Sequence, residues 1–134
     1  MASGRYLIDT NIAIAFLEGD IQVHAELNQA REVFVPVVVI GELCFGAAKS
    51  GRPAENAARI EQFVEGRRIL LVDAAVARQY GIVKNQLKRK GRPIPENDIR
   101  IAAIALELGL MLVTRDAHFG VIDDLMVESW SAPT

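Results

Sequence analysis

Four acidic residues stand next to or inside apolar segments of this sequence. They are Asp9, Glu42, Asp98 and Asp116. Carboxylates that are brought together in a partly dry place repel one another and resist ionisation. Proteins commonly tolerate such an arrangement because the acids hold a metal ion or share a proton. These residues can do such chemistry together only if the surrounding elements bring them to one place.

Asp98 lies on the apolar side of a predicted helix. Pro95 stands where a helix can begin, and Gly109 stands where one can end. At about 100° per residue, the wet face of this helix consists of Glu96, Asn97, Arg100 and Glu107. Asp98 lies about 160° from Arg100 on the same helical wheel. Its neighbours there are Ile101, Ala102, Ala105 and Leu106. The carboxylate of Asp98 therefore needs a partner.

Asp9 and Asp116 each follow a short apolar run that predicts a buried strand. The runs are residues 6–8 and residues 110–113, and both are typical of central strands in a parallel sheet. Ligands of open α/β sheets bind beyond the carboxyl ends of the strands. The two acids are therefore predicted to face one site, and the start of the helix that carries Asp98 lies at the same edge.

A simpler role for Asp9 stays open at this point. A helix is predicted over residues 11–17, with Thr10 or Asn11 as its cap. Asp9 can instead be the residue that caps this helix, with no part in any chemistry.

Glu42 lies in a segment whose structure is ambiguous from sequence. The β-branched run at residues 37–40 favours a strand, whereas Pro36 suits the first turn of a helix. We predict a helix from Pro36 to about Ser50, on which Glu42 shares a face with Val38, Val39 and Phe45. The alternative for Glu42 is a glutamate whose stem lies along that face with its head in water.

A site rich in carboxylates and poor in histidine and cysteine suits a hard cation such as Mg²⁺ or Mn²⁺. A cation of this kind can activate water and neutralise charge on a phosphoryl oxygen. The four acids therefore point to phosphodiester hydrolysis.

The remaining elements alternate between strands and helices. Strands are predicted at residues 33–35, 69–72 and 126–127, and helices at residues 20–31, 54–64 and 74–90, with a linker at 121–124. Inward positions are predicted at Ile21, Ala25, Leu27 and Ala30 in the first of these helices and at Ala57, Ile60, Phe63 and Val64 in the second. Because each connection is long enough for a right-handed crossover, the sequence predicts a single α/β domain over residues 1–134, built as a three-layer sandwich around a mostly parallel sheet.

Composition agrees with a globular protein of ordinary type. The 134 residues are 51% hydrophobic and 24% charged, with a net charge of −2, so no global basic field attracts nucleic acid. Residues 1–5 are too short and polar for a secretory signal, and no apolar run is long enough for a bilayer. Cys44 is the only cysteine, so it forms no internal disulfide or cysteine zinc site. We expect a cytoplasmic protein with no membrane partner.

Two further groups of residues have open roles. Lys84, Lys88, Arg89, Lys90 and Arg92 form a basic run shortly before Asp98. Such a run is usually a solvated face, and the sharper alternative is a nucleic-acid path beside the acids. His24 has no partners at metal-ligand spacing, which favours a surface or half-buried position.

The chain resembles PIN-domain ribonucleases of the VapC type, the toxins of bacterial type II toxin–antitoxin pairs. The matching segments are LIDTN at residues 7–11, GEL at 41–43 with Gly46, ND at 97–98 with IAA at 101–103, and LVTRD at 112–116 with HF at 118–119. The resemblance covers nearly the whole chain. It implies a flavodoxin-like sheet, a metal site of the four acids, endoribonuclease activity, a homodimer, and a VapB-like antitoxin that blocks the site.

On this resemblance, we assign Asp9, Asp98 and Asp116 as direct ligands of Mg²⁺ or Mn²⁺. Glu42 either ligates the cation or orients the attacking water as a general base. Thr114 and Asn11 are candidates for orienting these acids, and His118 is expected to have a packing or hydrogen-bonding role.

Two rival functions remain. A receiver-like signalling domain would also have a parallel sheet with acids at strand ends, with Asp73 as its phosphoacceptor. Against it, only one acid follows the first strand, and Thr114-Arg115 stands where a receiver needs a lysine. An RNA-binding protein with an inactive nuclease fold is disfavoured because all four acids are present.

Overall fold

The computed structural model describes residues 4–131 and has a parallel sheet at its centre. The strands are β1 (Arg5–Ile8), β2 (Glu32–Pro36), β3 (Arg68–Leu70), β4 (Met111–Val113) and β5 (Val127–Glu128), in the order β3-β2-β1-β4-β5. Residues 1–3, which belong to the segment too short for a secretory signal, lie outside the described part. The α/β class and the parallel sheet are confirmed.

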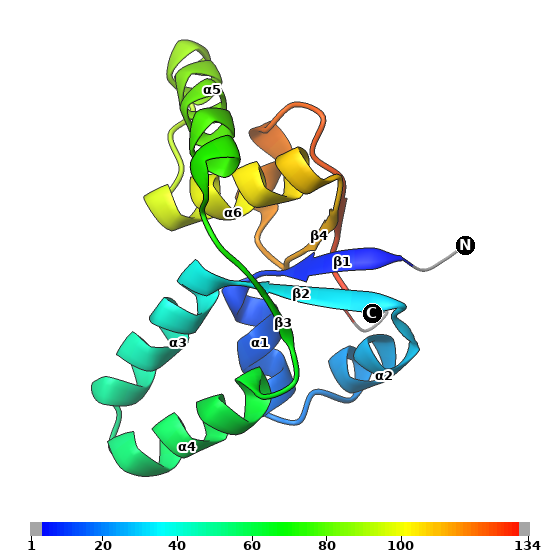
Figure 1. Cartoon of the computed structure of the whole chain (residues 1–134), viewed down its shortest axis with the longest axis vertical. Coiled ribbons are helices and arrows are strands. Elements are labelled where there is room, and N and C mark those ends of the chain that lie inside the picture. The colour runs from blue at the N-terminus through cyan, green and yellow to red at the C-terminus, as the bar shows by residue number, and fades with distance from the viewer. Residues whose placement is uncertain (1–3, 132–134) are drawn as a thin grey trace.

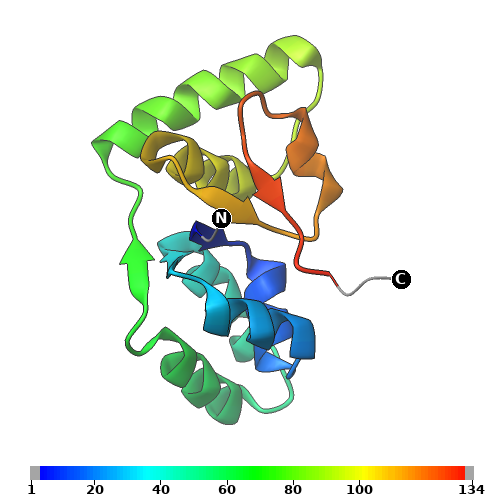
Figure 2. The same ribbon diagram turned by 90° about the vertical axis from the view of Figure 1, so that its right-hand side faces the viewer.

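Helices cover both faces of this sheet. They are α1 (Thr10–Leu17), α2 (Ile21–Gln29), α3 (Val37–Ala48), α4 (Pro53–Val64), α5 (Ala74–Lys90) and α6 (Glu96–Leu108), followed by the 3₁₀ turn η1 (Ala117–Val121). Figure 1 shows α1 to α4 below the sheet and α5 and α6 above it. The side view in Figure 2 shows the same three layers. None of the helices in residues 4–131 has the length and apolar character needed to cross a membrane.

The strand order decides where the site can form. β1 is central. From β1 the chain adds β2 and β3 on one side of the sheet and then β4 and β5 on the other side, so the topological switch point lies between β1 and β4. In the flavodoxin order 2-1-3-4-5, the third strand is central. Here β3 is at the edge of the sheet. The three layers of the expected flavodoxin-like fold are therefore present, but the strand order differs from that of flavodoxin.

The position of β3 also removes the receiver-like alternative. Asp73 follows this edge strand, away from the switch point, and its side chain caps α5 by accepting a hydrogen bond of 3.0 Å from the Val76 N–H. Asp73 is therefore a helix cap rather than a phosphoacceptor at the centre of the sheet.

Helix α6 forms where the sequence predicted it. It starts after Pro95 and ends at Gly109, whose φ of 66° is a left-handed conformation that glycine adopts without strain. Asp98 and residues 99 and 101–105 are buried, whereas Glu96, Glu107 and Leu108 are exposed, so the predicted wet face lies at the two ends of the helix.

The ambiguous segment after β2 is a helix, as predicted. Pro36 closes β2 and stands immediately before the first turn of α3, where its missing N–H has no cost. The inner face of α3 is formed by Val39, Leu43 and Ala47, however, and Phe45 is 66% exposed. The apolar face predicted for Glu42, Val38, Val39 and Phe45 is therefore buried only on the side of Val38 and Val39.

Some inward positions were predicted wrongly. In α2, Val23 and Leu27 lie four residues apart and set the inner stripe, which leaves Ile21 and Ala25 exposed. In α4, Ile60 and Phe63 reach the core, while Ala57 stays outside. The third strand stops at Leu70, the last strand is shifted by one residue, and η1 occupies part of a predicted linker.

Candidate metal centre

The carboxyl ends of β1 and β4 bring the first pair of site residues together. The two strands are paired in register, with Ile8 opposite Val113, and the Asp9 N–H continues the ladder to the Val113 carbonyl at 2.9 Å. The first residue after β4 is Thr114, whose hydroxyl donates to Asp9 Oδ2 at 2.7 Å. Residues 105 positions apart in sequence are thereby fixed against each other.

Asp9 is both a helix cap and a member of the acid cluster. It caps α1 by accepting from the Thr10 N–H at 2.8 Å, so the caps predicted at Thr10 or Asn11 are wrong. Only 3% of Asp9 is exposed. This burial raises the pKa of its carboxyl above the usual range, against the hydrogen bonds from Thr114 and Thr10, and the charges of Asp98 and Asp116 raise it further.

A small hydrogen-bonded turn shapes the loop after β4. The Asn11 amide donates to Thr114 Oγ1 at 3.3 Å and to Asp9 Oδ2 at 3.4 Å, and its oxygen accepts from the Arg115 N–H at 3.2 Å. The Asp116 N–H donates to Thr114 Oγ1 at 3.0 Å. Asn11 and Thr114 thus connect Asp9 to the backbone that carries Asp116.

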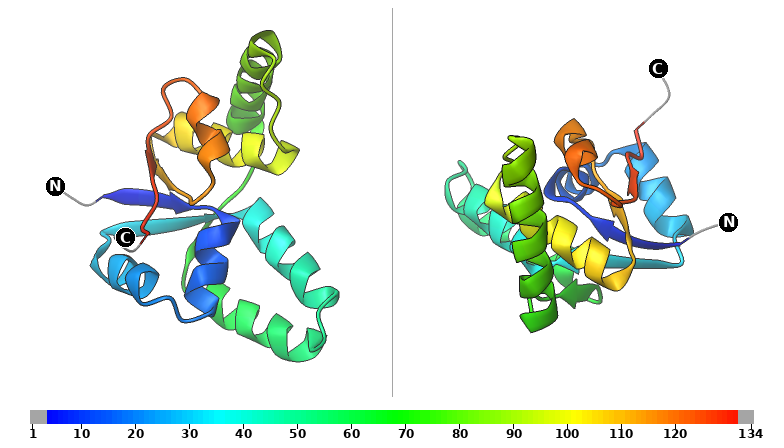
Figure 3. Two further views of the ribbon diagram at one scale, coloured as in Figure 1. Left: turned by 180° about the vertical axis from the view of Figure 1, so that it is seen from behind. Right: turned by 90° about the horizontal axis from the view of Figure 1, so that it is seen from above.

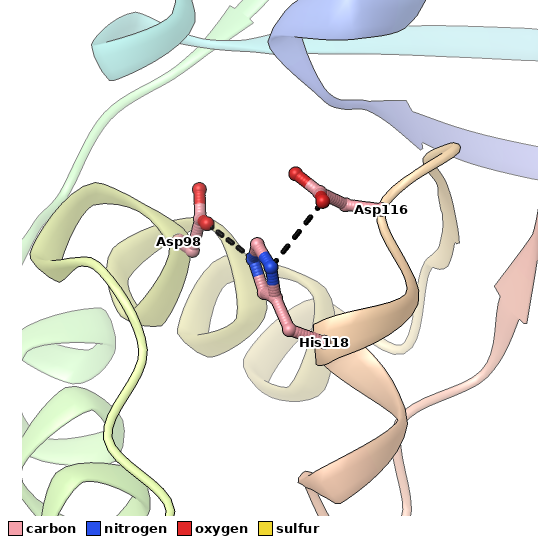
Figure 4. A group of neighbouring side chains, drawn as sticks. All are labelled: Asp98, Asp116 and His118. Carbon is pink, nitrogen blue, oxygen red and sulfur yellow. Dashed lines mark hydrogen bonds and ion pairs between the residues drawn. The ribbon is translucent and has the colours of Figure 1, made fainter.

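Asp98 enters the site from the first turn of α6. Its carboxylate Oδ2 lies 2.5 Å from His118 Nε2, and the other ring nitrogen, Nδ1, lies 3.3 Å from Asp116 Oδ1. Figure 4 shows the His118 ring standing between the two carboxylates. The pKa of Asp98 is raised above its usual range, chiefly by burial, with smaller contributions from the charges of Glu42 and Asp116, while His118 opposes the shift.

Glu42 reaches the cluster from α3. Its carboxylate accepts a hydrogen bond from the Thr10 hydroxyl, directly beside Asp9 in sequence, and its charge acts on Asp98. Glu42 is half-buried and borders a mostly apolar cavity of about 300 Å³ between α1, α3 and α4. All four acids named by the sequence therefore lie towards one edge of the sheet, but only Asp98 and Asp116, with His118, are close enough to share an ion, whereas Asp9 and Glu42 act on them through their charges.

His118 is the residue whose position the sequence did not predict. A hydrogen-bonding role was expected, but not a contact with two of the four acids at once. The only available signal was its spacing of two residues from Asp116, which is the N-cap residue of η1, while His118 lies in its first turn. One ligand atom from each of Asp98, Asp116 and His118 lies within 4.8 Å of the others.

The donor set fits a hard divalent cation. Oxygen ligands dominate, and two of the acids are buried enough for their pKa values to rise. Among residues 4–131, the ion pairs of the four acids involve only His118 and no lysine or arginine. The negative charge at this edge is thus unmatched by the described part of the chain, and a divalent cation would balance it.

Comparison with known proteins places the chain in a family. The PIN domain family matches residues 6–125. The chain is 36% identical to ribonuclease VapC2 of Haemophilus influenzae, an alignment that covers 94% of this chain and 98% of the relative. It is 35% identical to the tRNA(fMet)-specific endonuclease VapC of Shigella flexneri, over 95% and 98% of the two chains.

Solved structures agree with the sequence relatives. A chain of the DNA-bound VapBC of Salmonella typhimurium superposes with a TM-score of 0.90 at 28% identity, over 96% of this chain and all of that one. A chain of VapBC2 from Rickettsia felis, bound to a DNA fragment from its promoter, gives a TM-score of 0.89 at 26% identity, over 95% and 99%.

Proposed function

The chain belongs to the PIN-domain family and, within it, to the VapC ribonucleases, and from that membership we propose that it is a metal-dependent endoribonuclease acting as the toxin of a toxin–antitoxin pair. One observation supports this most strongly. Four carboxylates, carried by the residue after β1, by α3, by α6 and by the loop after β4, lie near the switch point of the sheet, with no lysine or arginine of residues 4–131 to neutralise them. The substrate class is RNA, and the whole of residues 1–134 acts as one domain.

The proposed roles follow from where each acid is held. Asp9, Asp98 and Asp116 bind Mg²⁺ or Mn²⁺, and Glu42 either joins them or orients the attacking water as a general base. The cation, when bound, supplies an activated water and neutralises charge on the phosphoryl oxygens. The Thr10 hydroxyl fixes the Glu42 carboxylate, and the Thr114 hydroxyl fixes that of Asp9.

His118 has a supporting role in this proposal. Its two nitrogens hold Asp98 and Asp116 at distances of 2.5 Å and 3.3 Å, which keeps both carboxylates aimed at the same space. Such contacts reduce the freedom that the acids would lose on binding a cation.

We propose a VapB-like antitoxin as the partner, because the similar chains come from VapBC complexes. An arginine of that partner would pair with the acids in bidentate fashion and compete with the cation. We also propose that the chain forms a homodimer and works in the cytoplasm. The reducing compartment agrees with its single, exposed Cys44.

The activity is tested on the purified protein, free of any partner. RNA should be cut when Mg²⁺ or Mn²⁺ is present, and cutting should stop in EDTA. Asp9→Asn serves as the control for a contaminating nuclease, and mapping the cut ends on cellular RNA after brief expression identifies the target. Cleavage that continues at full rate in EDTA would exclude the metal mechanism.

The blocking role of the partner is tested separately. Affinity for the antitoxin is measured with the wild type and with the Asp9→Asn, Asp98→Asn double variant. If a partner arginine enters the acid cluster, the double variant should bind clearly more weakly. Equal affinities would show that the partner covers another surface.

A further inference from the structure

Arg115 stands between two residues of the candidate site but makes its side-chain contacts elsewhere. Thr114 and Asp116 flank it in the loop after β4. Its guanidinium Nη2 lies 3.0 Å from Asp20 Oδ2 and donates to the Trp130 carbonyl, also at 3.0 Å. One side chain therefore connects the loop to the start of α2 and to the segment that follows β5.

Trp130 is anchored more firmly than its place near the chain end suggests. It is only 6% exposed, its ring meets Tyr6 of β1 edge-on at 5.1 Å, and its Nε1 donates to Glu128 Oε2 at 3.0 Å. Its backbone has a φ of 51°, a conformation that a non-glycine residue keeps only when surrounding contacts hold it. Figure 2 and Figure 3 show this segment running from β5 past β1 towards α2.

The Asp20 end of the contact is also built into the fold. Asp20 caps α2 by accepting from the Val23 N–H at 3.0 Å, so its carboxylate cannot follow Arg115 if the loop moves. About 30% of each side chain in this pair is exposed, at 31% for Arg115 and 29% for Asp20. A pair that is largely covered and held by a helix cap restrains geometry better than a pair between two free side chains.

The loop is held on one side by its contacts with Asn11 and His118, and on the other side by the segment after β5. The Thr114 N–H donates to the Glu128 carbonyl at 2.9 Å, and the Asp116 N–H donates to Thr114 Oγ1 at 3.0 Å. The first of these bonds also ends on the segment that Trp130 anchors. The position of the Asp116 carboxylate therefore depends in part on how well the segment from Glu128 to Trp130 is docked, besides its contact with His118.

We propose that Arg115 is a positioning residue that couples the docking of the C-terminal segment, residues 128–130, to cation binding at Asp116. The presence of a cation at Asp116 rests on the proposed function, whereas the coupling itself concerns cation affinity and does not require RNA cleavage. Coupling between two equilibria is reciprocal. Docking of the segment strengthens cation binding, and cation binding tightens the contacts around Trp130. Trp130 is the only tryptophan of the chain, so its emission reports on the docking directly.

Three variants break the contact in different ways. Arg115→Gln removes the charge and the fork of donors. Arg115→Lys keeps the charge but replaces the planar guanidinium, whose Nη2 donates to both partners, with a compact ammonium. Asp20→Asn removes the ion pair and keeps the helix cap, because asparagine caps helices as well as aspartate does. Arg52→Gln is the matched control, because Arg52 pairs with Glu55 in a fully surface-exposed contact on α4.

The measurements are Mn²⁺ affinity by titration of the free ion, and Trp130 emission and quenching with and without Mg²⁺. Arg115→Gln and Asp20→Asn should weaken Mn²⁺ binding by roughly tenfold or more, as is usual for residues that orient metal ligands. Arg115→Lys should lose less, and Arg52→Gln should match the wild type. Mg²⁺ should shield Trp130 from quencher in the wild type, and it should do so less in Arg115→Gln and Asp20→Asn.

Two results would overturn the coupling: wild-type Mn²⁺ affinity in a folded Arg115→Gln and in Asp20→Asn, or a Trp130 signal that ignores Mg²⁺ in the wild type. RNA cleavage is assayed in parallel, so that the two proposals separate. If the wild type cuts no RNA but the variants lose Mn²⁺ affinity, the coupling stands and the proposed activity is wrong. If the wild type cuts RNA and the variants keep their Mn²⁺ affinity, the proposed activity stands and the coupling is wrong.

Discussion

The first turn of α6 carries two acids, Glu96 and Asp98, in opposite surroundings. Glu96 is exposed and accepts from the Tyr80 hydroxyl, and it pairs with Lys84 at 3.0 Å. These contacts, first that of Tyr80 and then that of Lys84, lower the pKa of Glu96 below its usual range. Asp98 is buried beside other carboxylates, and burial raises its pKa.

The two clusters differ in charge balance and in what that balance is for. Around Glu96, the positive charges of Lys84 and Arg100 balance the one carboxylate. The same two side chains also lie over the Tyr80 ring, at 5.6 Å and 5.4 Å from its centre. Around Asp98, His118 is the only side chain of residues 4–131 that pairs with the negative charge. A contact that serves the fold can settle its charges internally. A cluster that must accept a cation has to leave its charge unmatched until the ion arrives.

The largest expected difference between the clusters is in catalysis. Asp98→Asn keeps the shape of the side chain and removes a ligand charge, so RNA cleavage should fall by on the order of a hundredfold or more, since even residues that only support metal ligands cost about 10- to 100-fold. Glu96→Gln, two residues away, should keep its activity within a few-fold, and initial rates in Mg²⁺ measure both.

Stability should move in the opposite direction. In EDTA at neutral pH, Asp98→Asn should melt at or above the wild type, because like-charge repulsion and burial of charge are relieved. Excess Mg²⁺ should then raise its melting temperature less than that of the wild type. A variant that melts well below the wild type in EDTA would mark Asp98 as a structural residue.

The elements that bring the acids together were predictable from sequence, because they depend on local patterns. The apolar side of α6, the strand ends at Asp9 and Asp116, and the proline before α3 are readable within a few residues. The finer contacts were not predictable, because they join distant segments. Arg115 and Asp20 are 95 residues apart, so packing alone decides their contact.

The burial errors have the same origin. Ile21 was predicted to lie inside and Phe45 to lie on an apolar helix face, but little in residues 4–131 covers them, and they are 86% and 66% exposed. Asp9 illustrates the other limit. Its sequence context offers a helix cap and a site residue as alternatives, whereas in the structure one carboxylate oxygen accepts from Thr10 and the other from Thr114.

The basic residues at the end of α5 and just after it also differ in whether a carboxylate balances their charge. Lys84 is neutralised by Glu96, and Lys90 by Asp123 at 2.7 Å. Lys88, Arg89 and Arg92 have no carboxylate partner among the described residues. The prediction that the run docks RNA therefore narrows to these three side chains.

Replacing Lys88, Arg89 and Arg92 by glutamine should weaken RNA binding for all sequences and flatten its salt dependence, by about 0.7 in the log–log slope for each phosphate that is no longer neutralised. The Lys84→Gln, Lys90→Gln double variant should change the slope less, because its charges are already paired. Binding to a single-stranded RNA at several salt concentrations measures this, and equal slopes for all three proteins would make the run a solvated face only.

The pH dependence of stability should distinguish the two clusters without any catalysis. Asp9 and Asp98 have pKa values raised above the ordinary 3.8, so between 3.8 and the raised values the folded protein binds more protons than the unfolded chain. In EDTA, their contribution to the free energy of unfolding therefore falls as pH rises through that window, and their destabilisation is complete above it.

Glu96 and Asp20 have lowered pKa values, so the stability they contribute is present above their ordinary values and is lost as pH falls through the folded ones. Urea unfolding of the wild type and Asp98→Asn over a pH series in EDTA isolates the acid cluster. The stability advantage of Asp98→Asn should grow with pH through the window. Parallel profiles would mean that Asp98 is not destabilised by its surroundings.

The smallest effect is expected from the Tyr80 hydroxyl, and its smallness is informative. Tyr80→Phe removes a donor to Glu96 and an acceptor for Lys84 at 3.2 Å, but leaves the ion pair of 3.0 Å between these two charged side chains in place. Because the group is exposed, water replaces both hydrogen bonds. Neither the melting temperature nor RNA cleavage should change measurably. If cleavage falls while the melting temperature holds, the cluster around Glu96 positions the first turn of α6, and Asp98 depends on it. The structural contacts of Glu96 would then also support the site chemistry of Asp98, because both residues lie in the same helical turn.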